Sequence, residues 1–85
     1  KCGGLLEARR MIAAARVHGL SVMMGCMIET SLGITAAAHL APLLDYADLD
    51  GAALLADDPH EGATIVAGRI AIPDAPGLGV RLRPR

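Results

Sequence analysis

The chain has 85 residues, of which 53% are hydrophobic, but Tyr46 is its one aromatic residue. A small independent core usually needs bulky filler. An apolar fraction made mainly of Ala, Leu, Ile, Val, Met and Gly therefore favours a piece of a larger packed body. Eight basic and nine acidic residues give a formal net charge of −1. This balance argues against a basic binding surface, so we expect neither nucleic acid nor a membrane as a partner.

No segment has the pattern of a membrane span or of a secretion signal. The longest stretch without a charged side chain covers residues 30–44 and is interrupted by Pro42, which makes it too short for a bilayer. Charged residues such as Arg10 stand where a signal peptide needs an apolar run. Cys2 and Cys26 lie far apart and do not form a disulfide framework. We therefore expect a cytoplasmic protein with reduced thiols.

The first elements are predicted to be a helix and a strand. Apolar residues recur at helical spacing from Leu5 to His18, which predicts a helix that Gly19 closes. The apolar run Leu20–Met24 then predicts one short buried strand.

The next elements repeat this order. Thr30 or Ser31 can cap a helix that reaches about Leu44, and its apolar residues indicate burial on more than one side. Tyr46–Asp50 predicts another short strand. Alternating helices and strands are typical of parallel βα units. Two strands cannot close a barrel, so we expect further strands before Lys1, and a start on Lys instead of Met is consistent with this expectation.

The last part of the chain changes character. We therefore divide the chain into residues 1–58, the βα units, and residues 59–85. Thr64–Val66 and Arg69–Ile72 flank Ala67-Gly68, a pattern that predicts a β-hairpin with a tight turn. Prolines and glycines follow, which indicates a non-helical path. We expect the hairpin and tail to pack on another part of the protein.

Two aspartates mark the end of the second predicted strand. In a parallel βα body, ligands bind at the carboxyl ends of the strands. Asp48 and Asp50 are two residues apart on one strand, so their side chains point to the same side. Neighbouring carboxylates repel each other unless a cation, such as an ammonium group or a metal ion, lies between them. Two exposed acids at a strand end are the alternative.

The segment after the first predicted strand is a second candidate. Gly25, Cys26 and Met27 could line a pocket in which a ligand approaches the backbone, or they could form an ordinary turn. No base lies at a spacing that would make Cys26 a nucleophile. His60 beside two aspartates could bind a metal, or it could belong to a solvated loop.

Five motifs span the chain: KCGG at residues 1–4, MGCMIETSLGI at 24–34, AAAHLA at 36–41, DLDG at 48–51 and PGLGV at 76–80. In this order and spacing they resemble the late barrel of dipeptide epimerases of the L-Ala-D/L-Glu type. Those enzymes belong to the muconate-lactonizing subgroup of the enolase superfamily. The resemblance covers essentially the whole chain, and the combination of motifs is more specific than any one of them.

The resemblance implies an α/β fold. The chain would be the C-terminal part of a (β/α)-barrel, from the end of strand 6 to strand 8, with a short β tail that returns to the capping domain. Family members bind Mg²⁺ through acidic residues on earlier strands. They move a proton at the α-carbon of a dipeptide's C-terminal residue, through an enediolate, with two lysines on opposite faces. Lys1 matches a non-catalytic lysine, and the catalytic lysine is expected just upstream, so we expect no catalytic residue and no metal ligand in this chain.

Carried over residue by residue, the resemblance implies substrate-binding roles. Asp48 and Asp50 correspond to the pair that grips the α-ammonium group of the dipeptide. Gly25, Cys26 and Met27 correspond to a pocket segment beside the substrate, and Cys26 replaces a small polar residue that is common there.

The expected function is therefore that of an isomerase: a magnesium-dependent dipeptide epimerase, complete only with its N-terminal cap and barrel strands. One alternative is a cycloisomerase or an o-succinylbenzoate synthase of the same superfamily, although their substrates lack the α-ammonium group. Another is a non-catalytic fragment. A homo-oligomer would be compatible with the sequence.

Overall fold

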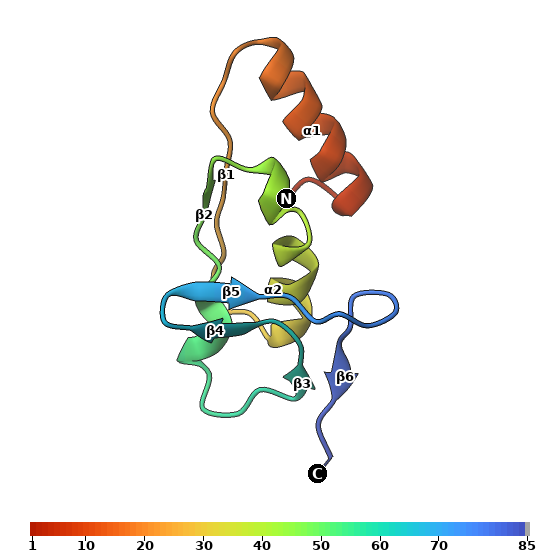
Figure 1. Cartoon of the computed structure of the whole chain (residues 1–85), viewed down its shortest axis with the longest axis vertical. Coiled ribbons are helices and arrows are strands. Elements are labelled where there is room, and N and C mark those ends of the chain that lie inside the picture. The colour runs from red at the N-terminus through yellow and green to blue at the C-terminus, as the bar shows by residue number, and fades with distance from the viewer. Residues whose placement is uncertain (85) are drawn as a thin grey trace.

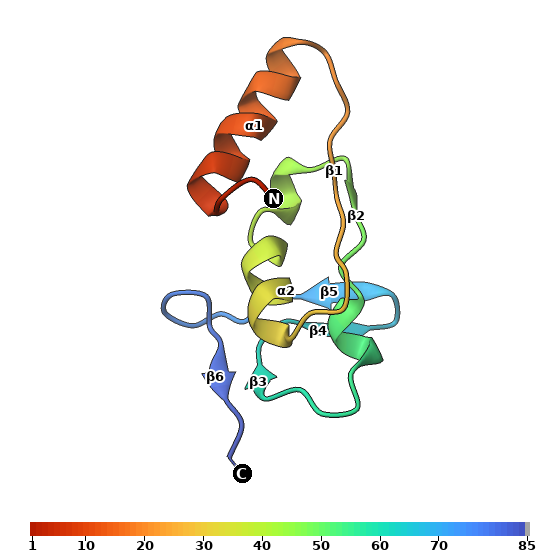
Figure 2. The ribbon, with the colours of Figure 1, turned by 180° about the vertical axis from the view of Figure 1, so that it is seen from behind.

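A computed structural model describes residues 1–84 as an elongated body with extents of 46 × 25 × 23 Å. Its elements in chain order are α1 (Leu5–Val17), β1 (Met23–Met24), α2 (Ser31–Ala38), the 3-10 helix η1 (Ala41–Leu43), β2 (Tyr46–Ala47), the 3-10 helix η2 (Gly51–Leu54), β3 (His60–Glu61), β4 (Thr64–Val66), β5 (Arg69–Ala71) and β6 (Arg81–Leu82). Helix α1 lies at one end, β1 and β2 run side by side, and the β4–β5 hairpin lies toward the other end (Figures 1 and 2). Within residues 1–84, no helix is both long and apolar enough to cross a membrane.

Helix α1 agrees with the predicted helix from Leu5 to His18. Its buried side chains are Ala8 and Ile12, one turn apart on the predicted apolar stripe. Gly19 ends the helix as predicted, because its φ of 70° lies in the left-handed region that glycine adopts without strain.

Strands β1 and β2 form a parallel pair. Met23 lies opposite Tyr46, and Met24 lies opposite Ala47. The predicted parallel pairing of the βα units is therefore confirmed.

Both strands are shorter than the predicted Leu20–Met24 and Tyr46–Asp50. At the start, the amide of Val22 donates to the carboxylate of Asp45 at 2.7 Å instead of to a neighbouring strand. At the end, the amide of Asp48 donates to the carbonyl of Met24 at 2.9 Å. Asp50 then turns to φ −94° and ψ 4°, which leads into η2 instead of continuing the strand.

An ion pair fixes the amino ends of the two strands. The guanidinium group of Arg16 pairs with the carboxylate of Asp45 and also donates to the carbonyls of Leu20, at 3.2 Å, and Leu43, at 3.0 Å. The Val22 amide and then the Arg16 guanidinium hold the pKa of Asp45 below its ordinary value. This Arg16–Asp45 clasp joins the end of α1 to the start of β2.

Helix α2 ends at Ala38, so the prediction of a helix reaching Leu44 is wrong. Pro42 has no amide hydrogen and its ring clashes with the preceding turn, and the chain continues as η1 instead. The buried residues of α2 are Ser31, Ile34, Thr35 and Ala38. Leu32 is 44% exposed, so α2 is buried along one face and not on several sides.

The predicted hairpin is present. In it β4 and β5 pair antiparallel, with Val66 opposite Arg69. Ala67 and Gly68 take φ values of 50° and 75°, as a two-residue type I′ turn requires. Strands β3 and β6 form a second antiparallel pair, in which Glu61 lies opposite Arg81. The sequence did not predict this pair.

The segment after residue 58 packs on α2. The hydroxyl of Thr35 accepts the amide hydrogen of Ala63 at 2.8 Å, and Nε2 of His39 lies 2.9 Å from the carbonyl oxygen of Leu78. A Cβ on Gly62 would lie 2.2 Å from the Thr35 hydroxyl, so glycine is needed for this approach. Within this chain the tail therefore lies against the βα units. Its contact with a capping domain stays a prediction.

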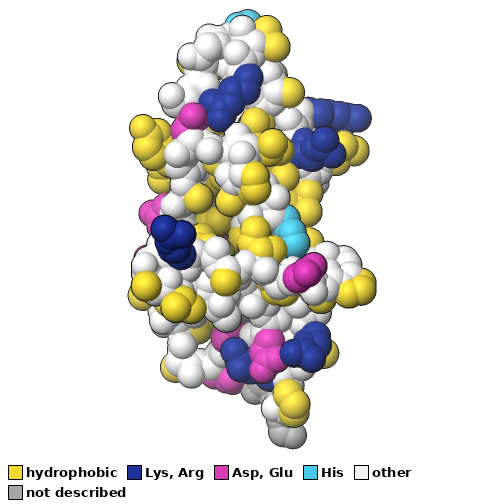
Figure 3. Space-filling view, viewed as in Figure 1, with side chains coloured by type: hydrophobic (Ala, Val, Ile, Leu, Met, Phe, Trp, Pro, Cys, Tyr) yellow, Lys and Arg dark blue, Asp and Glu magenta, His cyan; other side chains and the backbone are white. Residues whose placement is uncertain are grey.

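The core is small for so apolar a sequence. Ile34, Ala38 and Leu49 form its central cluster. Among residues 1–84, sixteen large hydrophobic side chains are exposed, and Met27 and Val17 exceed 80% exposure. Apolar side chains are spread over the face seen in Figure 3, including the middle of the body. The exposure agrees with the expectation of a piece of a larger packed body.

Candidate functional site

The carboxyl ends of β1 and β2 lie together because the two strands are parallel. The segment 25–30 leaves β1 at this end, and the segment 48–50 leaves β2 beside it (Figure 1). The two stretches singled out in the sequence therefore meet, as expected for strand ends of a βα body.

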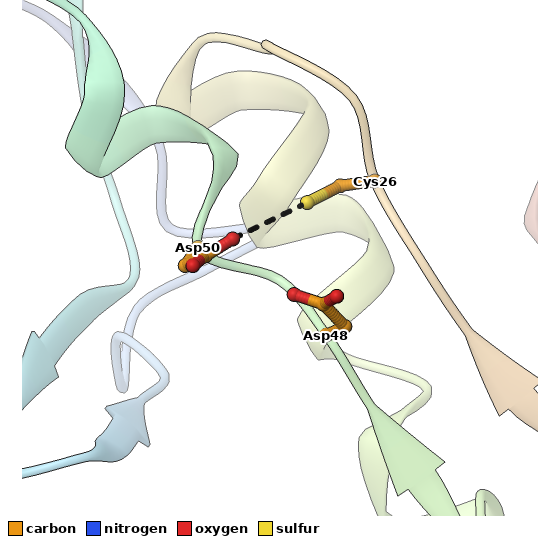
Figure 4. A group of neighbouring side chains, drawn as sticks. All are labelled: Cys26, Asp48 and Asp50. Carbon is orange, nitrogen blue, oxygen red and sulfur yellow. Dashed lines mark hydrogen bonds between the residues drawn. The ribbon is translucent and has the colours of Figure 1, made fainter.

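The side chains after β2 alternate. Leu49 is 2% exposed and packs against Ile34 and Ala38, whereas Asp48 and Asp50 are exposed. The predicted placement of the two carboxylates on one side is confirmed, because Leu49 takes the core side. Figure 4 shows both aspartates lying toward Cys26.

Cys26 completes a cluster of three. Its Sγ lies 4.0 Å from Oδ1 of Asp50, to which the thiol donates (Figure 4). One ligand atom from each of Cys26, Asp48 and Asp50 lies within 4.8 Å of the other two. The cluster joins the ends of β1 and β2 and presents two carboxyl groups and a thiol.

Gly51 sets how closely the two strand ends approach. A Cβ at this position would lie 2.1 Å from the carbonyl oxygen of Met27 and 3.2 Å from Sγ of Cys26. No side chain fits between these atoms. Glycine is therefore required here by the close contact, and not by an unusual φ angle. The sequence analysis missed this role, although Gly51 closes the DLDG motif.

The other two residues of the predicted pocket contribute less. Met27 contacts Gly51 through its carbonyl group, while its side chain is 81% exposed. Gly25 is exposed, and a Cβ there would meet only the end of the Met23 side chain, at 3.9 Å. The structure therefore brings Cys26 to the aspartates, but not the side chain of Met27.

The donor atoms of the cluster decide whether it could hold Mg²⁺. It is the one group of three potential ligands found among residues 1–84. Mg²⁺ prefers near-octahedral oxygen ligands at about 2.1 Å, and a thiol is not among the ligands it favours. The cluster therefore does not fit a magnesium site. The alternative of a metal bound by His60 gains no support, because His60 belongs to no such group among these residues.

Asp58 caps helix α2 from a distant part of the sequence. Its carboxylate accepts from the amide of Ser31 at 3.0 Å, from the Ser31 hydroxyl at 2.5 Å and from the amide of His60 at 3.0 Å. Partial burial raises the pKa of Asp58, but the hydrogen bonds from Ser31 and His60 outweigh it and lower the pKa overall. Sequence reasoning missed this cap, because Ser31 and Asp58 are 27 positions apart in the sequence.

Asp58→Asn is expected to lower the free energy of unfolding by about 1 kcal/mol near neutral pH, the usual size of a lost helix cap. A carboxyl whose pKa is lowered by folding stabilises fully above its unfolded pKa, here 3.8, and this contribution is lost as the pH falls through the folded pKa. Denaturant unfolding at a series of pH values should show the difference between wild type and variant shrinking below about pH 4. Asp74→Asn, an exposed aspartate in the tail, is the matched control. A difference that is constant with pH would contradict the charged cap.

The comparisons with known proteins agree with this architecture. The sequence matches the family described as enolase C-terminal domain-like over residues 1–85. The chain belongs to this family. Its fold is the C-terminal part of a (β/α)-barrel, as predicted.

Two curated relatives of this chain are epimerases. An L-Ala-D/L-amino acid epimerase of Flavobacterium johnsoniae is 51% identical over 82 residues, which cover 96% of this chain and 24% of that protein. An L-Ala-D/L-Glu epimerase of Bacteroides thetaiotaomicron is 46% identical over 80 residues, which cover 94% of this chain and 21% of that protein. The resemblance to dipeptide epimerases is confirmed.

A solved structure gives the same result. A dipeptide epimerase from Methylococcus capsulatus, complexed with Mg and the dipeptide L-Arg-D-Lys, matches with a TM-score of 0.87 and 44% identity, over 94% of this chain and 24% of that one. The chain thus spans about a quarter of the length of the curated relatives it matches.

Proposed function

We propose that this chain is the C-terminal, substrate-binding portion of a magnesium-dependent dipeptide epimerase. The enzyme would invert the α-carbon of a dipeptide's C-terminal residue by removing its proton and returning one to the opposite face. The observation that carries the proposal is the pair of carboxylates of Asp48 and Asp50, which lie together at the strand ends beside Cys26. The similarity to dipeptide epimerases over nearly the whole chain supports it.

The proposed task of this chain is to hold one end of the substrate. The α-ammonium group of a dipeptide would bind between Asp48 and Asp50, where its charge offsets the repulsion of the carboxylates. Holding the amino end directs the rest of the dipeptide toward groups on other strands. The two lysines that move the proton, and the ligands of Mg²⁺, would come from other strands of the barrel.

The paired carboxylates argue against the two alternative reactions of the superfamily. A cycloisomerase or an o-succinylbenzoate synthase acts on substrates without an ammonium group, and two carboxylates at the site would repel an anionic substrate. We also propose a cytoplasmic location, which the two free thiols support.

The test is α-proton exchange by the full-length protein in deuterium oxide. With Mg²⁺ present, dipeptides should gain deuterium at the α-carbon of the C-terminal residue, as followed by NMR, and chelation of the metal should stop the exchange. Single amino acids, which lack the second residue, serve as the control. Turnover of amine-free dicarboxylates without exchange of any dipeptide would replace the proposal with a cycloisomerase, and no exchange at all would favour a non-catalytic role.

A further inference from the structure

The three side chains of the site form a triangle of acceptors. The ligand atoms of Cys26, Asp48 and Asp50 all lie within 4.8 Å of one another, and the side chains converge on one space (Figure 4). Because no two of these atoms are more than 4.8 Å apart, a single nitrogen atom can lie at roughly 3 Å from all three, an ordinary length for a charge-assisted hydrogen bond. The spacing therefore matches an ammonium nitrogen.

A primary ammonium group has three N–H donors, one for each corner of this triangle. Two corners are carboxylate oxygens, and the third is the Cys26 sulfur, a weaker acceptor. In the free protein the thiol hydrogen points to Oδ1 of Asp50. Because a thiol hydrogen rotates freely, it can turn away when an ammonium group enters and leave a sulfur lone pair directed at the nitrogen.

The position of the sulfur is set by the backbone. The Met27 carbonyl and Cys26 Sγ lie where a side chain on residue 51 would be, so Gly51 lets the first loop rest directly on the second. Cys26 is half-buried, in contrast to the exposed Met27 that follows it. The cysteine is therefore held at the cluster, whereas its neighbour faces outward.

We infer that Cys26 binds the third N–H of the substrate's ammonium group and thereby selects dipeptides with a primary α-amine. The inference rests on the proposed function. An N-methylated N-terminal residue, or an N-terminal proline, has only two N–H donors on the charged nitrogen. Its extra carbon would lie against one corner of the triangle, where it removes water without replacing a hydrogen bond.

The test compares the best dipeptide substrate with its N-methyl form in the full-length protein. We expect wild-type kcat/KM for α-proton exchange to fall by about tenfold or more on N-methylation, the size of one lost hydrogen bond to a charged group. Cys26→Ala opens space at the third corner, so this ratio should shrink several-fold while KM for the primary amine rises. Cys26→Ser, which keeps an acceptor, should retain the wild-type preference.

Two controls separate selection from general damage. Cys2→Ala removes the other thiol, which lies outside the cluster, and should leave the ratio unchanged. A merely structural role of Cys26 would lower both rates equally in Cys26→Ala and leave the ratio at its wild-type value, which would overturn this inference alone. Failure of every dipeptide to exchange in the wild type would overturn the proposed function and this inference with it.

Discussion

Asp48→Asn is expected to lower kcat/KM for a dipeptide by about two to three orders of magnitude. Removing one partner of a hydrogen-bonded charge pair typically costs about 2–5 kcal/mol, and each 1.4 kcal/mol corresponds to a factor of ten. Asparagine keeps the size of the side chain but removes its charge, so the ammonium group loses half of its counter-charge. Steady-state exchange kinetics of the full-length protein measure the loss.

An N-acetylated dipeptide isolates the cause of that loss. Acetylation removes the positive charge, so Asp48→Asn should weaken binding of this analogue, measured by competition, much less than binding of the free dipeptide. Asp74→Asn is the matched control, because it makes the same chemical change on an exposed tail residue outside the cluster. Equal losses for both ligands would rule out an ammonium clamp at Asp48.

Gly51→Ala should disturb the site and the stability together. The new Cβ would lie 2.1 Å from the Met27 carbonyl oxygen, a backbone atom that cannot move without shifting its whole loop. Overpacking of this kind typically costs about 1–3 kcal/mol. We expect a lower midpoint of thermal unfolding and a raised KM for the dipeptide, because the shift takes Cys26 away from Asp50.

Gly33→Ala is the matched control for this change. Gly33 lies within α2, and a Cβ there would meet the carboxylate end of the exposed Glu29 side chain at 3.3 Å, a group that can swing away. Alanine in a helix is favoured over glycine by about 0.5–1 kcal/mol, so this variant should be neutral or more stable. A normal KM in Gly51→Ala would show that the close approach does not position the site.

Local patterns in the sequence predicted the local elements well. The apolar stripe and Gly19 defined α1, and Ala67-Gly68 defined the hairpin, because both depend on neighbours along the chain. The predicted end of α2 was wrong because apolar residues continue past Ala38, and this pattern concealed the break that Pro42 imposes. The β3–β6 pair was missed, since two-residue strands carry no periodicity of their own.

The candidate site was likewise predicted only in part. Alternation along one strand was enough to place Asp48 and Asp50 together. The contact of Gly51 with the Met27 carbonyl depends on two loops that are far apart in sequence. The distance between two loops cannot be read from spacing along the chain, so the role of Gly51 became apparent only in the structure.

The Arg16–Asp45 clasp lies at the amino ends of the strands, and the candidate site lies at their carboxyl ends. The ion pair that anchors the strands and the proposed substrate-binding cluster therefore lie at opposite edges of the same sheet. A substitution at residue 26 does not touch the clasp, so the proposed substrate preference can change without loosening the strands.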